Sequence, residues 1–429
     1  MTGASLVRSD AAAIPLGDNT VDLIVTSPPY FALRSYQDGG EHYDGQIGSE
    51  ATPAAFLEAL WAVTAECWRV LKPSGSLFVN LGDKYAGTGG GNSNGGLSKP
   101  DKKRKGWDEA NNPMATAAHD NRSMPKNNSV QTTGFVRAKS LMGLPWRYAI
   151  GCIDGQADPD GRGWVLRSEI VWSKPNGLPE SVTDRVRRSH EQWFHMTKEG
   201  RYYSNVDEVR EPHTSDTTDR RGEGGAPEVG MRRFAADGTR HTDGNPLGKL
   251  PGSVWTVPTQ PLIVPDWLDV DHFAAFPTEW PRKLILGWSP PGICVECGEG
   301  RRSVAEASAE YQEFRRNAGD WNQKAKAHGR EAVGNQSANR QELPDGARTI
   351  TGTACACDKP TAPTTPAVVL DPFGGTGTTA MVARALGRYG ISCDLSGDYQ
   401  RLAKWRIWQS GMGAKVESRT NGERQGVLL

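Results

Sequence analysis

The chain has 429 residues, enough to bury a full core and to hold more than one module. Its 50 basic and 50 acidic residues cancel, which excludes an overall positive field that would attract a nucleic acid. No apolar run approaches the roughly 18 residues of a membrane span, and the N-terminus lacks the basic and apolar regions of a signal peptide. Seven cysteines, an odd number, argue against a disulfide framework, so we expect a cytoplasmic protein with no membrane partner.

The first informative stretch is a short apolar run near the N-terminus. Val21 to Val25 is typical of a buried parallel strand. Pro28 and Pro29 cannot extend a strand, so we predict that it ends in the polar turn Thr26-Ser27-Pro28-Pro29-Tyr30. A strand that is merely stopped by prolines, with an incidental tyrosine, has the same pattern.

Basic residues gather in three clusters in the middle of the chain. Each cluster by itself is typical of a solvated loop, and that interpretation is weaker for the three clusters together. The clusters are Lys99, Lys102, Lys103, Arg104 and Lys105; then Arg185, Arg187 and Arg188; then Arg220, Arg221, Arg232 and Arg233.

A second informative stretch lies near the C-terminus. The apolar run Ala367 to Leu370 leads into Asp371-Pro372-Phe373-Gly374-Gly375-Thr376-Gly377-Thr378-Thr379 and then into residues 380–386, which predicts strand, glycine turn and helix. Three glycines let the backbone pass close to a ligand, and the first amides of the helix are free to hold a polar group. An ordinary tight turn between a strand and a helix has similar glycines.

The next apolar strand strengthens the case for a ligand. Tyr389 to Cys393 ends in Asp394, about 20 residues beyond the turn, where Rossmann-like folds hold ribose hydroxyls. We therefore predict a ribose-bearing cofactor. Ligands of open parallel sheets bind beyond the carboxyl ends of the strands, so the turn from Ser27 to Tyr30 should lie beside that cofactor.

The two turns, in this order, resemble the amino-methyltransferases of DNA that use S-adenosylmethionine. A catalytic turn that precedes the cofactor turn is similar to the β-class arrangement, a circularly permuted order of the methyltransferase sheet. The blocks at residues 69–80, 163–176, 190–198 and 272–281 match the same family, and the resemblance covers most of residues 5–83, 140–212, 251–292 and 366–408. It implies an α/β, Rossmann-like methyltransferase fold that acts on double-stranded DNA.

The resemblance also divides the chain. The catalytic core would comprise residues 1–83, 140–212, 251–292 and 366–410, interrupted by a glycine-rich basic loop at 84–139, a target-recognition region at 213–250 and a cysteine-bearing insertion similar to a zinc ribbon at 293–365, with a tail at 411–429.

The catalytic residues that the resemblance implies are Ser27, Pro28, Pro29 and Tyr30. An exocyclic amine is a poor nucleophile, because its lone pair is delocalised into the ring of the base. The Ser27 side chain and the Pro28 carbonyl would accept the hydrogens of the amine and free that lone pair. Tyr30 would offer a flat face to a base flipped out of the duplex.

The resemblance also assigns the cofactor pocket, with one acidic residue for each half of the nucleoside. Asp394 would hold the ribose, and Asp10 matches an acidic position near the adenine, although an aspartate there is also typical of a turn. Phe373 would pack near the cofactor, unless it is an ordinary core residue. Phe276 lies in a segment that resembles the helix entry of the family's cofactor pocket. The other expected cofactor residues are Thr26 and Pro372, together with Asp371, Gly374, Gly375, Thr376 and Gly377 at the methionine end.

The target base is predicted from one position of the catalytic turn. A serine at position 27 resembles the cytosine-N4 branch, whereas adenine-N6 enzymes more often carry Asp or Asn there. We expect a cytosine-N4 methyltransferase, with an adenine-N6 enzyme and an inactive DNA-binding protein as alternatives. The DNA site, the oligomeric state and the presence of a separate cognate restriction endonuclease stay open.

Four of the cysteines suggest a metal site in the insertion. Cys294 and Cys297 have the two-residue spacing that lets both thiolates reach one metal ion, whereas Cys355 and Cys357 are separated by one residue, a less usual spacing. We predict one structural zinc ion, against the alternative of free thiols on a loose loop. The remaining cysteines, Cys67, Cys152 and Cys393, are predicted to be buried small residues.

Overall fold

The computed structural model describes residues 3–32, 37–38, 41–42, 46–87, 136–177, 179–180, 182–211, 247–262, 264–268, 270, 275–309, 312–313, 348–359 and 361–426. The first and third basic clusters and most of the predicted recognition region lie outside these ranges. Within them, no helix has the length and apolar character needed to cross a membrane.

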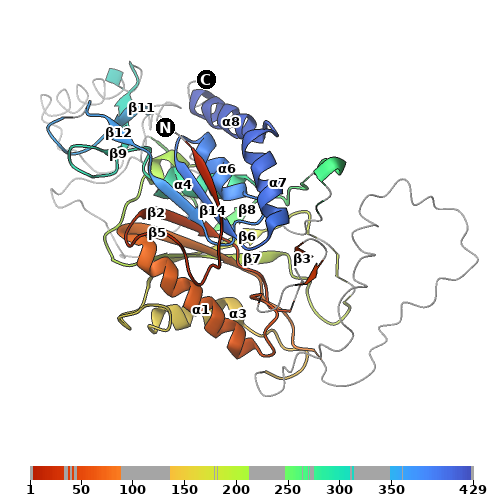
Figure 1. Cartoon of the computed structure of the whole chain (residues 1–429). Coiled ribbons are helices and arrows are strands. Elements are labelled where there is room, and N and C mark those ends of the chain that lie inside the picture. The colour runs from red at the N-terminus through yellow and green to blue at the C-terminus, as the bar shows by residue number, and fades with distance from the viewer. Residues whose placement is uncertain are drawn as a thin grey trace, which may run out of the picture.

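A single large sheet forms the centre of the fold (Figure 1), with eight strands in the order β1-β14-β13-β2-β5-β7-β6-β8. Only β7 runs against its neighbours in this sheet; the other strands are mutually parallel. The strands are β1 (Ala4–Arg8), β2 (Val21–Thr26), β5 (Leu71–Leu81), β6 (Val165–Ser173), β7 (His190–Thr197), β8 (Val254–Thr256), β13 (Val368–Asp371) and β14 (Tyr389–Asp394).

The order of the strands confirms the permuted α/β fold that the resemblance implies. β13, which comes late in the chain, lies in the middle of the sheet between β14 and β2. The strand with the Thr-Ser-Pro-Pro-Tyr turn and the strand with the glycine turn are therefore direct neighbours. Parallel strands of this kind need helical crossovers, which cover both faces of the sheet.

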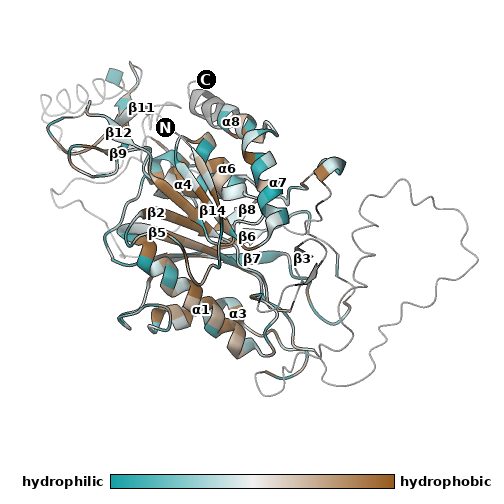
Figure 2. Cartoon of the chain, in the orientation of Figure 1, coloured by the Kyte–Doolittle hydropathy of each residue, from teal (hydrophilic) through white to brown (hydrophobic). Residues whose placement is uncertain are grey.

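Helices pack on both faces, as Figure 1 shows. One face is covered by α1 (Pro53–Val70) and α3 (Leu144–Ile153). The other is covered by α4 (Glu279–Trp288), α6 (Thr378–Ala385), α7 (Gly397–Trp408) and α8 (Met412–Gly426). The central strands are the most hydrophobic part of the molecule (Figure 2), and β2 is buried along its whole length.

Helix α1 shows how the local sequence sets one of these elements. The Thr52 side chain accepts a hydrogen bond from the Ala55 amide, and Pro53 occupies the first helical turn, where no amide donor is needed. Phe56, Leu60 and other residues at helical spacing are buried against the sheet. The helix is therefore capped by its sequence and held by its apolar face.

Small elements surround the sheet. They are the strands β3 (Gln37–Asp38), β4 (Glu41–His42), β9 (Ile293–Cys294), β10 (Arg302–Ala307), β11 (Arg348–Ala354) and β12 (Thr364–Thr365), and the short helices η3 (Val206–Val209) and η6 (Asp266–Leu268). β9 to β12 belong to the predicted cysteine-bearing insertion, and the predicted tail contains α8.

His195 of β7 lies in the interior of the protein. Its ring stacks on Phe78 with centroids 4.2 Å apart, and its Nε2 atom lies 3.0 Å from the Ser76 hydroxyl. Burial lowers the pKa of His195 to about 3, with a smaller contribution from the charge of Arg167. The imidazole is therefore neutral in the folded protein and becomes protonated on unfolding below its ordinary pKa.

This burial predicts a pH-dependent stability. The unfolded chain takes up a proton at His195 near its ordinary pKa of about 6.5, whereas the folded chain does not, so the free energy of unfolding falls as the pH is lowered. Between about pH 7.5 and about pH 5.5, the free energy of unfolding of His195→Phe should fall by roughly 1 kcal/mol less than that of the wild type, as measured by urea denaturation. His190→Gln, which removes an exposed histidine from the same strand, should behave like the wild type. Identical pH dependence in His195→Phe and wild type would contradict this assignment.

Candidate active site

The two sequence-predicted turns lie side by side at one edge of the sheet. β13 pairs with β2 in parallel, with Leu370 opposite Ile24, so both strands deliver their last residues to the same edge. There the Thr26 hydroxyl donates a 2.7 Å hydrogen bond to Oδ1 of Asp371. The first turn is thus joined directly to the second.

Asp371 is the centre of this junction. Its side chain is buried, and Oδ1 also accepts from the Phe373 amide at 3.1 Å, while Oδ2 accepts from the Thr379 hydroxyl at 2.9 Å. Burial raises the pKa of the Asp371 carboxyl to about 6, and the hydrogen bonds from Thr26 and Thr379 oppose that rise. The carboxyl group therefore positions the turn, and a direct contact with the cofactor stays a prediction.

The glycines of the second turn have different roles. A Cβ atom on Gly374 would lie 1.8 Å from the Ser392 hydroxyl oxygen, so the turn packs directly on β14. Gly375 has a φ of +48°, and a Cβ there would meet nothing closer than 3.9 Å. Open space beside a positive-φ glycine at a helix N-terminus fits a cofactor that approaches the backbone closely.

Arg406, which the sequence analysis missed, supports the same turn from α7. It is buried, and its Nη1 atom donates to the Thr376 carbonyl at 2.8 Å and to the Thr378 hydroxyl at 2.7 Å. Burial lowers the pKa of Arg406 to about 10. In the sequence it is an ordinary basic residue of a polar helix, so no local signal marks it.

The other predicted cofactor residues differ in burial and in the contacts that they make. Asp394 ends β14 beside the glycine turn and accepts from the Gly375 amide at 2.8 Å. Asp10 is exposed after β1 and accepts from the Ala12 amide at 2.9 Å, which makes it a turn residue. Phe276 packs at right angles on Trp193, with ring centroids 5.8 Å apart. Pro372 is buried within the turn.

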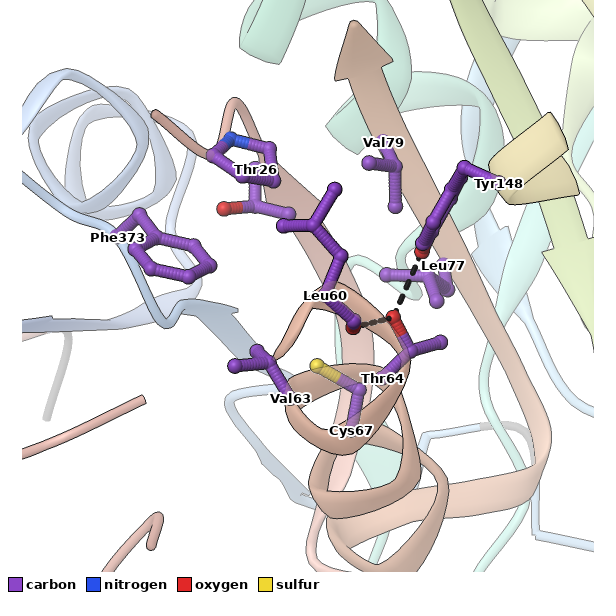
Figure 3. Close-up of a pocket in the computed structure, with 10 residues that line it drawn as sticks. Thr26, Leu60, Val63, Thr64, Cys67, Leu77, Val79, Tyr148 and Phe373 are labelled. Carbon is purple, nitrogen blue, oxygen red and sulfur yellow. Dashed lines mark hydrogen bonds between the residues drawn. The ribbon is translucent and has the colours of Figure 1, made fainter. Parts of the chain in front are cut away.

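A small cavity lies beneath the junction, between the sheet and α1 (Figure 3). Thr26, Pro28 and Phe373 close one end of it, and the Thr64 hydroxyl lies 2.7 Å from the Tyr148 hydroxyl at the other. The lining is mostly apolar, so this is a packing defect of the core and not the cofactor pocket. Phe373 accordingly packs against the core as well as bordering the turn.

The catalytic turn is held by Asn80 of β5, a buried residue that sequence analysis did not single out. Asn80 Nδ2 donates to the Gln192 carbonyl at 3.1 Å, which directs Oδ1 toward the turn. Oδ1 accepts from the Ser27 hydroxyl at 3.3 Å and from the Tyr30 hydroxyl at 2.8 Å. One amide oxygen therefore orients both side chains.

An ion pair completes the polar edge. Glu191 Oε2 lies 2.8 Å from the Tyr30 hydroxyl, and its other oxygen pairs with Lys174. The Lys174 ammonium also lies over the Trp172 ring, 4.0 Å from its centroid. Glu191 and Lys174 stand in blocks that match the family resemblance, which was the available signal for them.

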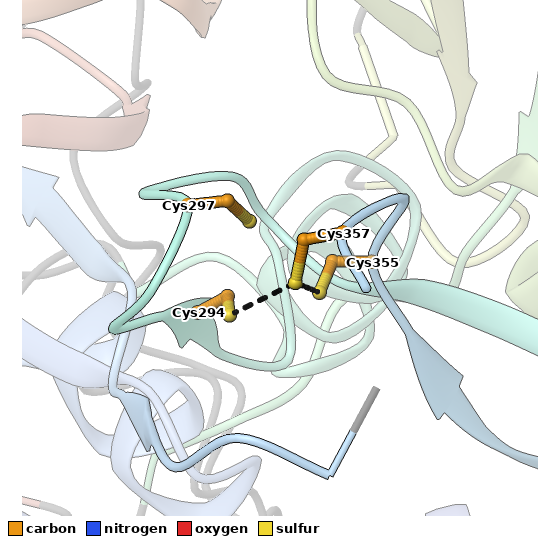
Figure 4. A group of neighbouring side chains, drawn as sticks. All are labelled: Cys294, Cys297, Cys355 and Cys357. Atoms are coloured by element: carbon orange, nitrogen blue, oxygen red, sulfur yellow. Dashed lines mark hydrogen bonds between the residues drawn. The ribbon is translucent and has the colours of Figure 1, made fainter. Parts of the chain in front are cut away.

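The four predicted metal ligands come together elsewhere in the fold. The sulfur atoms of Cys294, Cys297, Cys355 and Cys357 all lie within 4.8 Å of one another (Figure 4). Cys67, Cys152 and Cys393 are buried, as predicted, and all seven cysteines are free thiols.

The different surroundings of the glycines predict different effects of the same substitution. Gly374→Ala should destabilise the fold by roughly 1–3 kcal/mol, because its methyl group collides with β14. Gly375→Ala meets no steric clash, so it should cost only the strain of a positive φ, roughly 1 kcal/mol, but it should weaken binding of S-adenosylmethionine about 10-fold, since its methyl group points into the open approach. Calorimetric titration and thermal melting measure the two effects.

Gly387→Ala is the matched control for Gly375→Ala. Gly387 has a φ of +79° at the opposite end of α6, and a Cβ there would meet nothing within 4 Å. It carries the same backbone strain without the predicted contact, so the affinity should stay at the wild-type value. Equal affinities in Gly375→Ala and Gly387→Ala would move the cofactor away from this turn.

The chain is similar in sequence to known DNA methyltransferases. The chain matches the model of the DNA methylase family N6_N4_Mtase over residues 21–295 and 364–405. The Type II methyltransferase M.Cfr9I of Citrobacter freundii is 36% identical over 297 residues, which are 69% of this chain and 76% of that protein. M.SmaI of Serratia marcescens, also a Type II methyltransferase, is 31% identical over 277 residues, 65% of this chain and 72% of that protein.

Among solved structures, the cytosine-N4-specific PvuII DNA methyltransferase aligns over 99% of this chain and 94% of its own, with 14% sequence identity and a TM-score of 0.48. The extent of the family match identifies the chain. It belongs to the DNA methylase family of S-adenosylmethionine-dependent N6 and N4 methyltransferases.

Proposed function

We propose that the protein methylates the exocyclic N4 amine of cytosine in double-stranded DNA, at a specific sequence and on a base flipped out of the duplex. The observation that carries this proposal is the hydrogen bond from the Ser27 hydroxyl to Asn80 Oδ1, 3.3 Å long. It determines which hydrogen-bonding role is left for Ser27.

A serine hydroxyl has one donor hydrogen and two acceptor lone pairs. Because the hydrogen points to Asn80, the lone pairs are free to accept from an amine at the edge of the sheet. Accepting those hydrogens disfavours the planar, conjugated form of the amine and exposes its lone pair for attack. The Pro28 carbonyl is the second acceptor in this proposal.

Tyr30 serves the flipped base with its ring and the site with its hydroxyl. The hydroxyl lies 2.8 Å from each of two acceptors, Asn80 Oδ1 and Glu191 Oε2, and its one hydrogen serves one of them at a time. A Cβ on Gly82 would lie 2.7 Å from the Tyr30 ring. The ring is therefore wedged in one orientation, as a stacking surface must be. Lys174 keeps Glu191 in place through their ion pair.

The cofactor side of the site is formed by the glycine turn. S-adenosylmethionine supplies a methyl group on a positively charged sulfur. We propose that Asp394, which accepts from the Gly375 amide, also accepts from the ribose hydroxyls and that Gly374 to Gly377 line the methionine end. Asp10 remains our candidate near the adenine, and Phe276 remains a candidate for the cofactor pocket.

The position of the second basic cluster supports a contact with DNA. Arg185, Arg187 and Arg188 lie in the connection between β6 and β7, and β7 begins at this same edge, where Gln192 pairs with Leu81 at the end of β5. Arg185 stacks 3.8 Å over the Tyr85 ring and pairs with Glu180. We propose that this cluster contacts the phosphates and that residues 213–250 choose the sequence.

Mass spectrometry of nucleosides tests the target base. DNA incubated with the purified full-length chain and isotope-labelled S-adenosylmethionine should contain labelled N4-methylcytosine, because Ser27 occupies the first position of the catalytic turn. Sequencing of the modified positions should then show one short context. Labelled N6-methyladenine as the sole product would place the protein in the adenine branch.

Substitutions at the catalytic turn test the role of the hydroxyl. Ser27→Ala should lower kcat on the order of 10²-fold with unchanged affinity for S-adenosylmethionine, because the lost acceptor belongs to the base. Asn80→Ala should lower kcat in the same way, since the Ser27 hydroxyl is then unoriented. Ser27→Thr, which keeps a hydroxyl, should retain more activity than Ser27→Ala. Wild-type turnover in Ser27→Ala would remove Ser27 from the mechanism.

A further inference from the structure

Three of the four clustered cysteines lie outside the residues that match the family model. The family match stops at residue 295 and resumes at residue 364, so Cys297, Cys355 and Cys357 fall in the gap. We propose that these three cysteines and Cys294 bind one zinc ion, which is structural and holds the insertion together at a distance from the active site.

The distances between the sulfur atoms fit a tetrahedral site. Cys294 Sγ and Cys357 Sγ are 3.9 Å apart, and Cys355 Sγ and Cys357 Sγ are 3.3 Å apart. Four thiolates at the usual Zn–S distance of about 2.3 Å from one ion are separated by roughly 3.8 Å. A disulfide would need a separation of about 2.05 Å. The sulfurs are thus spaced for a shared ion.

The first cysteine pair has the backbone of a metal-binding turn. The Gly298 amide donates to the Cys294 carbonyl at 2.9 Å, and Gly298 has a φ of +72°, which reverses the chain. This reversal brings the Cys294 and Cys297 sulfur atoms within 4.8 Å of each other.

The second pair completes the site from another turn. The Cys357 thiol donates to the Lys359 carbonyl at 3.7 Å, and the Lys359 ammonium pairs with Glu296 of the first turn at 2.9 Å. The first turn connects β9 to β10, and the second connects β11 to β12. β9 pairs with β12, and β10 pairs with β11, both antiparallel. Each turn therefore connects one short ribbon to the other, and the four thiols meet between the ribbons.

Apart from the two strand pairs and the ion pair between Lys359 and Glu296, the described part of the insertion has little apolar packing to hold its two halves together. Among the described residues from 293 to 365, Cys294 alone has a buried side chain, and β10 has none. Small modules that bury so little apolar surface need a disulfide or a metal to be stable. Because the thiols are free, a metal is the remaining choice, and four sulfur ligands at tetrahedral spacing favour zinc.

The position of the site makes the ion structural. The insertion is joined to the amino end of β13, whereas the glycine turn follows the carboxyl end of the same strand. It is anchored by Tyr203, whose hydroxyl donates to the Arg301 carbonyl at 2.6 Å, and by Asn205, whose Nδ2 donates to the Ser303 hydroxyl at 2.9 Å. Four protein ligands also leave no open position for a reactant.

Metal analysis of the full-length protein tests the proposal. Protein purified without added metal should contain about one zinc per chain and lack iron, and a mercurial reagent that titrates the thiols should release that zinc. The double variant Cys294→Ser, Cys297→Ser should lose at least roughly nine-tenths of the zinc. Cys152→Ala, which removes a buried cysteine outside the cluster, should keep it.

Limited proteolysis provides a second readout that does not depend on activity. Loss of zinc should speed cleavage within residues 293–365 and leave the affinity for S-adenosylmethionine unchanged. Wild-type protein that contains no zinc, that contains iron in its place or that carries disulfides in this cluster would overturn the proposal. Zinc retained by the double variant, or released with loss of cofactor binding, would overturn it too.

Discussion

The active site depends on one buried carboxyl group. Asp371 accepts hydrogen bonds from Thr26 on the neighbouring strand, from Thr379 on the following helix and from the amide of its own turn. A buried aspartate without such partners would be costly, so the three donors and the carboxyl group require one another. Because Thr26 directly precedes Ser27, this arrangement fixes the catalytic turn and the cofactor turn in one frame.

Two further buried side chains hold the two turns in place, one for each turn. Asn80 orients Ser27 and Tyr30 from β5, and Arg406 holds Thr376 and Thr378 from α7. Each is buried and serves two partners at once. Methyl transfer to an amine needs the acceptor atoms and the donor at fixed positions, and such positions come from side chains that cannot move independently.

The sequence predicts most of the fold and both turns, because these features are local. Prolines that end an apolar run, glycines that precede a helix and the paired spacing of Cys294 and Cys297 can all be recognised from neighbouring residues alone. Asn80 and Arg406 could not be predicted, since their roles arise only when distant elements pack. Asp371 was predicted at the turn, but its partners in β2 and α6 become visible only in the structure.

The permuted order has a consequence for how the protein is made. The hydrogen bond between Thr26 and Asp371 joins residues 345 positions apart, and β13 fills the middle of the sheet. During synthesis, β2 leaves the ribosome early. The edge of β2 that pairs with β13 stays unpaired until almost the whole chain has been translated. The nascent chain therefore has no assembled catalytic centre, and its folding is governed by contacts that close last. A chain that terminates before residue 368 would lack β13 and expose the unpaired edge of β2. Such an edge promotes aggregation or degradation.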